Sequence, residues 1–374
     1  MEVSSKARLV ARMLACYDPR LNEDKEALRE ELGLSEHAVE TALRELRNAP
    51  PEETWPQHIR DIRVLGLKTL VAEAEPLRVE AREIDDLARV VPAHRYLYSY
   101  RVTMDNRAYY SYIVPVELED RLYSEIVEGL QGLRSVDIGW TTPIRAPCSP
   151  PTGDPRDEIA AARALEEEYA GLLKPPGRIK YGIIELMLYS VLDLNPLASK
   201  PDILDATWAV RERMGRDMPN VRVRLVKSKA MQAYERLSRQ RLIGRALLHK
   251  VHWHPPLSQS LVSLYVATDA ACAPRLYALA SRLRLAASVF AGESTAATVI
   301  VVPDQLLEDV RRSLGGCNAS TGTITYGFGT VLPFDMYHPR HGWRMEPYPL
   351  LDILKGKKIV TVSEEAVQAR TSQS

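Results

Sequence analysis

The sequence lacks the features that would assign it to a membrane or secreted class. No stretch approaches the roughly 20 consecutive apolar residues that a membrane-spanning helix needs. The first segment carries Lys6, Arg8 and Arg12 where a secretory signal has an apolar core. The formal net charge is zero, so the chain as a whole is not coated with positive potential. These absences predict a cytoplasmic globular protein with no membrane partner.

Cysteine pairs and catalytic motifs are also missing. The 4 cysteines lie far apart with no CxxC spacing, so we expect unpaired buried thiols at Cys16, Cys148, Cys272 and Cys317. No nucleophile elbow, phosphate loop or HExxH occurs. The sequence therefore predicts no catalytic residue, no cofactor and no metal site. Frequent arginine beside only 3 phenylalanines is typical of a thermophilic archaeon.

The chain's length and its changing pattern predict several domains. A chain of 374 residues exceeds one ordinary core, and roughly two to four domains are expected. We predict a winged helix-turn-helix over 1–55, a ferredoxin-like domain over 56–147, a linker with one helix over 148–178, a second winged helix-turn-helix over 179–246, a second ferredoxin-like domain over 247–335 and a tail over 336–374.

The stretch LGLSEHAVETALRELRNA, residues 32–49, predicts a capped amphipathic helix. Ser35 can accept a backbone N–H at the helix start. One face is apolar: Ala38, Val39, Ala42, Leu43 and Leu46. With two further helical patterns at 6–17 and 23–32, this predicts a helix-turn-helix.

The pattern after a proline-rich break predicts a βαββαβ unit, which is then repeated. Strands are expected at 67–75, 95–104, 108–116 and 135–142, with helices at 76–91 and 118–130. The second set has helices at 181–194, 202–215 and 226–244, a strand at 261–269, a helix at 274–285, a hairpin within 286–303, a helix at 306–314 and a strand at 321–332. Because IVPVELEDRLYSEIV and VVPDQLLEDVRRSL correspond, we predict an internal duplication and an α+β fold.

The stretches LGLSEHAVETALREL (32–46) and AMQAYERLSRQRLIGRA (230–246) resemble the Lrp/AsnC family of archaeal and bacterial transcription regulators. That resemblance implies a winged helix-turn-helix followed by a ligand-sensing domain in each copy. It also implies double-stranded DNA as partner, and a homodimer or an intramolecular pseudo-dimer. The main functional hypothesis is a DNA-binding transcriptional regulator.

Charge favours the second helix-turn-helix as the DNA reader. Residues 211–250 carry twelve basic and three acidic side chains, whereas 22–49 carry eight acidic and four basic ones. A basic patch attracts phosphates, but it is also compatible with a solvated helix face. The candidate DNA contacts are Arg222, Arg224, Lys227, Lys229, Gln232, Arg236, Arg239 and Arg241, and, in the first copy, His37, Thr41 and Arg44.

The family's sensing domain has a hairpin turn near its small-molecule pocket. The corresponding turns here are Met104, Asp105 and Asn106 in the first copy and Gly292, Glu293 and Ser294 in the second. The resemblance implies a small-molecule effector at these turns. The first turn lacks the glycine that the family has in this turn. This difference argues against a binding site for a free amino acid.

Two other clusters leave alternatives open. Strict alternation would put Tyr96, Tyr98 and Tyr100 on one face of a strand, for sheet packing or for stacking on a flat ligand. His252 and His254 would likewise share a strand face, yet strand-edge histidines are favoured over a metal site.

An enzyme and an interaction module are the other classes of function. His94, Arg95, Tyr96 and Arg101 look like the substrate-binding side of siroheme decarboxylases, tetrapyrrole enzymes built on the same architecture. The third alternative is a protein-interaction module that uses the helix-turn-helix units as scaffold.

Overall fold

A computed structural model describes most of the chain. The described residues are 3–16, 25–50, 54–77, 90–148, 154–207, 227–240, 242–243, 245–253, 260–330, 332–338, 341–345 and 360–361. None of the helices within these ranges combines the length and hydrophobicity required to cross a bilayer.

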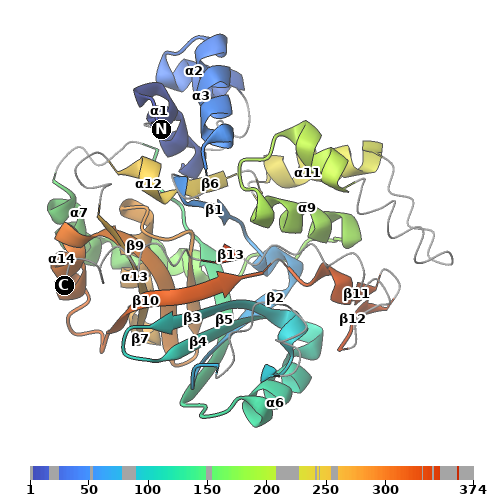
Figure 1. Cartoon of the computed structure of the whole chain (residues 1–374), viewed down its shortest axis with the longest axis vertical. Coiled ribbons are helices and arrows are strands. Elements are labelled where there is room, and N and C mark those ends of the chain that lie inside the picture. Colours follow the sequence, from blue (N-terminus) through green and yellow to red (C-terminus); the bar gives the residue numbers. More distant parts are fainter. Residues whose placement is uncertain are drawn as a thin grey trace.

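Three helices form in the first segment, where the sequence predicted them. They are α1 (Ser5–Ala15), α2 (Lys25–Leu32) and α3 (Glu36–Asn48), which make the lobe at the top of Figure 1. The Ser35 hydroxyl accepts the Ala38 N–H at 3.3 Å, which confirms the predicted cap. The face predicted to be apolar is buried at Val39, Ala42, Leu43 and Leu46.

Helices of the second set lie beside this lobe. They are α9 (Ile183–Leu194), a helical stretch over 200–207, and α11 (Lys227–Arg239). The rest of the helix expected at 202–215 lies outside the described residues. Strand β1 (Pro56–Ile59) pairs antiparallel with β6 (Arg245–Leu248), so the segments after the two sets of helices meet between the helices and the large sheet (Figure 1).

The large sheet contains two four-strand units. The first comprises β2 (Leu67–Ala74), β3 (Leu97–Thr103), β4 (Ala108–Pro115) and β5 (Ser135–Pro143), with α6 (Glu119–Gly129) between β4 and β5. The second comprises β7 (Leu261–Asp269), β8 (Ser288–Gly292), β9 (Thr295–Pro303) and β10 (Ser320–Gly329), with α13 (Ala273–Arg282) and α14 (Leu307–Ser313). Their strand orders, β3-β4-β2-β5 and β8-β9-β7-β10, are equivalent, and each is the order of a ferredoxin-like sheet.

The two units share one sheet that closes on itself. Strand β5 pairs with β8, and β10 pairs with both β7 and β3, so the strand order returns to its start. We call these contacts the β5–β8 junction and the β3–β10 junction. The sequence predicted two ferredoxin-like units, and this closed arrangement differs from that prediction.

Separate cores stabilise the inside and the outside of the closed sheet. Inside, one buried side chain from each of six strands packs together: Val71, Tyr109, Tyr265, Phe290, Ala297 and Ile324. Tyr109 and Tyr265 stack with ring centroids 3.6 Å apart. Outside, α6, α9 and α11 pack in a core with the first unit, and α13 and α14 pack in a core with the second.

Short elements fill the linker and the C-terminal region. The linker, predicted to hold one helix, contains α7 (Pro155–Ala161) and α8 (Glu166–Ala170) with 3-10 turns at Ala162–Leu165 and Gly171–Leu173. Further 3-10 turns lie at Arg63–Leu65, His94–Tyr96, Val116–Leu118, Ala270–Cys272, Asp304–Leu306 and Phe334–Met336. The remaining elements are α12 (His249–His252), β11 (Tyr337–His338), β12 (Gly342–Trp343) and β13 (Val360–Thr361).

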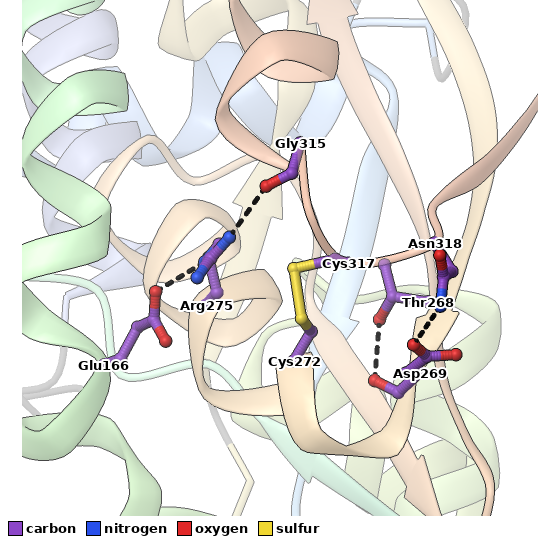
Figure 2. Close-up of a disulfide and its surroundings, with 8 residues drawn as sticks. All are labelled: Glu166, Thr268, Asp269, Cys272, Arg275, Gly315, Cys317 and Asn318. Carbon is purple, nitrogen blue, oxygen red and sulfur yellow. Dashed lines mark hydrogen bonds and ion pairs between the residues drawn. A yellow bond between two sulfur atoms is a disulfide. The ribbon is translucent and has the colours of Figure 1, made fainter.

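The expectation of unpaired thiols is wrong. Cys16 is bonded to Cys148 and Cys272 to Cys317, across 132 and 45 residues. The second disulfide joins the turn before α13 to the segment before β10, where Arg275 also bonds the Gly315 carbonyl (Figure 2). Spacing in the sequence did not show these pairs because only the fold brings their backbones together.

Two expected face assignments are also wrong. A register shift between Leu97 and Ser99 interrupts the alternation of β3, and Tyr96 lies in the 3-10 turn before the strand. The expected alternation is therefore broken at Tyr98, although all three tyrosines pack against the same core. His252 ends helix α12 instead of lying on a strand, and His254 lies outside the described residues.

Candidate functional site

Arg101 is the centre of a polar cluster at the β3–β10 junction. It lies directly opposite Tyr109 of β4, so its side chain is on the sheet face that forms the inside of the closed sheet. Its guanidinium bonds two main-chain carbonyls, that of Tyr100 at 2.8 Å and that of Phe328. Among the described residues, no carboxylate pairs with it.

Glycines of β10 make room for this guanidinium. Gly327 faces Arg101 in the strand register, and a Cβ on Gly327 would lie 2.5 Å from the Arg101 Cδ. Two residues on, a Cβ on Gly329 would meet nothing closer than 3.8 Å. The sequence GFG therefore lets a long cationic side chain cross β10 and leaves the next position open.

Tyr98 and Arg60 extend the cluster towards β1. The Arg60 guanidinium carbon lies 5.0 Å from the centre of the Tyr98 ring, a cation–π distance. Burial raises the pKa of the Tyr98 phenol, and the nearby Arg60 opposes that rise. The phenol therefore keeps its proton at neutral pH.

Asp193 of α9 binds His58 of β1 and Arg60, which directly follows that strand. His58 Nδ1 lies 3.2 Å from one oxygen of Asp193, and the Arg60 guanidinium bonds the other. Burial lowers the pKa of His58 more than Asp193 raises it, so the ring is neutral. His58 Nε2 is buried and has no hydrogen-bond partner among the described residues.

The electrostatics of the cluster leave one cation uncompensated. Burial lowers the pKa of Arg60, but Asp193, Tyr98 and Tyr189 together outweigh this, so the pKa is raised, and Arg60 forms a neutral pair with Asp193. Burial lowers the pKa of Arg101 to about 10, with Tyr98 acting in the opposite direction. Arg101 is still charged at neutral pH. A guanidinium bonded only to carbonyls, beside a protonated phenol, is suited to bind a carboxylate.

The candidate DNA contacts of the first copy lie on the surface of α3. His37, Thr41 and Arg44 are all exposed and follow one another at helical spacing. Glu36 is exposed on the same helix, whereas Glu45 binds the Ser4 hydroxyl at 2.6 Å.

The structure describes only part of the second candidate DNA face. Lys229, Gln232, Arg236 and Arg239 are exposed on α11. Arg236 forms an ion pair with Glu185 of α9, and the Arg239 Nε bonds the Glu235 carbonyl at 3.3 Å. Lys227 begins α11, while Arg222, Arg224 and Arg241 lie outside the described residues.

The candidate effector residues lie at the two hairpin turns. Met104 is 71% exposed, and Asn106 has a φ of 59°. In the second turn, the backbone N–H groups of Glu293 and Ser294 bond Asp137 of β5 at 3.1 and 2.9 Å. The first turn stands against β10, where the Met104 N–H bonds the Thr323 carbonyl at 2.8 Å.

The residues that suggested an enzyme separate into two groups. His94, Arg95 and Tyr96 lie in the 3-10 turn before β3, where Arg95 is 3.8 Å from Asp335 and the Tyr96 hydroxyl bonds the Arg344 carbonyl at 2.6 Å. Arg101 lies within the strand, in the polar cluster. The neighbours of Arg101 were not evident from the sequence, since Asp193 is separated from His58 by 135 residues and from Arg60 by 133. The alternation of His58 and Arg60 was the one available signal.

Comparisons with known proteins give only distant likenesses. No family model and no curated protein matches the chain. Among solved structures, siroheme decarboxylase NirDL has a TM-score of 0.45 at 11% identity, covering 98% of this chain and 100% of that one. The same enzyme with an iron-uroporphyrin III analogue gives 0.40 at 10% identity, covering 86% and 91%. An aspartate kinase from Synechocystis gives 0.27 at 10% identity, covering 86% and 56%. At these values none of the likenesses assigns an activity.

Within the described ranges, no group of three or more His, Cys, Asp or Glu side chains is placed to hold a metal ion.

Proposed function

We propose that the chain is an enzyme that binds a polycarboxylated tetrapyrrole at the β3–β10 junction and removes a carboxyl group from it, as siroheme decarboxylases do. Arg101 carries this proposal, because its guanidinium is bonded only to main-chain carbonyls and carries the one uncompensated charge of the cluster. Taking a cation out of water without a counter-ion is unfavourable. An anionic substrate would supply that counter-ion.

The residues around Arg101 fit a carboxylate better than a phosphate backbone. Arg101 lies on the inner face of a closed sheet, which a duplex cannot enter. Gly329 leaves space beside the guanidinium, whereas Arg101 itself fills the space over Gly327. The tetrapyrrole class rests on the sequence resemblance carried by His94, Arg95, Tyr96 and Arg101.

The reaction needs binding and a proton. In a decarboxylation the C–C bond to the carboxyl group breaks, carbon dioxide leaves, and the electron pair left on carbon takes up a proton. Tyr98 still bears its proton at neutral pH because burial raises its pKa, so it is the candidate donor. Arg60, held by Asp193, keeps a positive charge beside that phenol.

The test is a titration of the protein with iron-uroporphyrin III, followed by its visible absorption. We expect Arg101→Gln to weaken binding roughly 10- to 100-fold, because a charge-assisted hydrogen bond contributes about 1.5–3 kcal/mol. Mass spectrometry of siroheme incubated with the protein should show loss of carbon dioxide.

The matched control is Arg134→Gln, since Arg134 is exposed and directly precedes β5, three strands away from Arg101 across the sheet. It should bind the tetrapyrrole as the unaltered chain does. A chain that gives no spectral change, or an Arg101→Gln variant that binds equally well, contradicts the proposal.

A DNA-binding regulator is the second candidate, favoured by the exposed row of His37, Thr41 and Arg44 on α3. Phosphate contacts by basic side chains make binding weaken steeply with salt. A gel shift on genomic DNA at two salt concentrations tests this function, and absence of salt-sensitive retardation excludes it.

We further infer that the two halves are an internal duplication, each half being a winged helix-turn-helix followed by a ferredoxin-like unit, so that the chain forms a pseudo-dimer. The equivalent strand orders of the two units support this. So does the pairing of β1 with β6, the strands that follow the two helix-turn-helix regions.

A further inference from the structure

The turn between β8 and β9 encloses a carboxylate from another part of the chain. Backbone N–H groups of Glu293, Ser294 and Thr295 donate to Asp137 at 3.1, 2.9 and 2.7 Å. The Ser294 hydroxyl adds a bond of 3.0 Å to the same side chain. Three successive N–H groups that converge in this way form an anion-binding concavity, or nest.

The bonds are divided between both oxygens of Asp137. One oxygen accepts from the N–H groups of Glu293 and Ile138, the latter at 2.8 Å. The other accepts from the N–H groups of Ser294 and Thr295 and from the Ser294 hydroxyl. This is the bonding that a small bidentate carboxylate would make, so Asp137 fills the nest completely.

Two glycines allow the close approach. Gly139 of β5 faces Gly292 of β8 in the strand register. A Cβ on Gly292 would lie 2.4 Å from an Asp137 carboxylate oxygen, and one on Gly139 would lie 2.1 Å from the Ala291 carbonyl oxygen. Neither Cβ fits, so the carboxylate and the turn approach each other as closely as the backbone allows.

The other hairpin lacks this arrangement. In the turn between β3 and β4, the N–H groups of Met104 and Asn106 donate to main-chain carbonyls, at 2.8 and 2.9 Å. Its own Asp105 pairs locally with Arg107. The carboxylate nest therefore belongs to the second turn, although the sequence resemblance implied effector sites at both.

We infer that the β8–β9 turn is a carboxylate-binding site whose occupant is Asp137, and that free formate or acetate binds there once that side chain is removed. In the unaltered chain Asp137 excludes such ligands and holds the β5–β8 junction closed. This inference is independent of the proposed function, because the nest lies at the other junction.

The experiment measures thermal unfolding of Asp137→Ala in sodium formate and in sodium chloride of equal ionic strength. In chloride, we expect the variant to have a lower Tm than the unaltered chain. Its Tm should rise when formate is added and, in a second titration, when acetate is added, because a ligand that binds only the folded state stabilises it. The unaltered chain and Asp137→Asn, whose amide still fills the space, should respond equally to both salts.

Two further variants make the outcome specific. Asp105→Ala, which alters the other turn, should show no formate effect, and Asp137→Ala with Ser294→Ala should need more formate for the same rise. If Asp137→Ala folds poorly, its refolding yield in formate against chloride replaces the Tm. The inference is overturned if formate does not raise the Tm of Asp137→Ala, or if it raises the Tm of the unaltered chain by the same amount.

Discussion

The two junctions of the closed sheet have the same topology but opposite chemistry. At the β5–β8 junction Asp137 is bonded by the turn, and Arg63 is bonded by Asp61, Thr142 and two carbonyls. At the β3–β10 junction Arg101 has carbonyl partners only. The inner-facing positions also differ. Phe290 faces Thr141 at the β5–β8 junction, whereas Arg101 faces Gly327 at the β3–β10 junction. One junction is therefore built for stability, and the other retains binding capacity.

Removing Arg63 should have the largest effect on this contrast. The side chain is 4% exposed and forms a bidentate pair with Asp61, at 2.8 and 2.7 Å. Arg63→Ala leaves that carboxylate buried without a counter-ion, which costs about 3–5 kcal/mol of folding free energy. Denaturant unfolding measures the loss. A fall of less than about 1 kcal/mol would show that the β5–β8 side is not held by this pair.

A matched pair of glycine substitutions compares the space at the two junctions. Gly139→Ala places a Cβ 2.1 Å from the Ala291 carbonyl oxygen, so the strands must separate; we expect a loss of about 3 kcal/mol. Gly329→Ala meets nothing within 3.8 Å and should leave stability unchanged or raise it by up to about 1 kcal/mol. If thermal unfolding shows the same loss of stability for both variants, the two junctions do not differ in the space beside these glycines.

The pH dependence of stability should distinguish the two positions that follow the β1–β6 pair. Because Pro56 faces Leu248 and Ile59 faces Arg245, Arg60 and His249 are equivalent. Arg60 has Asp193 as a counter-ion, whereas His249 bonds the Gln57 amide at 3.0 Å. Burial lowers the pKa of His249 to about 3, so the folded ring stays neutral.

The sign follows from this lowered pKa. Below its ordinary pKa of about 6.5 the unfolded chain protonates His249 and the folded chain does not, so stability present above that pH is lost as the pH falls towards 3. Between pH 7 and pH 5 this histidine should account for about 2 kcal/mol. The measurement is denaturant unfolding of the unaltered chain and His249→Gln at both pH values. An identical fall in both would exclude His249 as the source.

Local features of the fold could be predicted from the sequence, and contacts between distant segments could not. Helix α3 could be predicted from Ser35 and the apolar positions, because capping and periodicity act within a few residues. The order of strands followed from similar local patterns. The disulfides and the register shift near Tyr98 depend on how units pack together, which no local pattern records.

The candidate site shows the same limit. Arg101 stood out beside the tyrosines, but its partners come from β1, α9 and β10, and nothing near Arg101 in the sequence indicates them. His37, Thr41 and Arg44 were predicted to lie on an exposed helix face, and they do. Their contact with DNA remains a prediction.

The closed sheet also determines when the chain can finish folding. The bond from Arg101 to the Phe328 carbonyl joins residues 227 positions apart, so the β3–β10 junction forms only after nearly all of the chain has been synthesised. Contacts of such long range slow folding, because the intervening chain must be ordered first. Until then β3 has an unpaired edge open to the wrong strand. The charged side chain at its centre, Arg101, would oppose such mispairing during synthesis as well as serving the finished site.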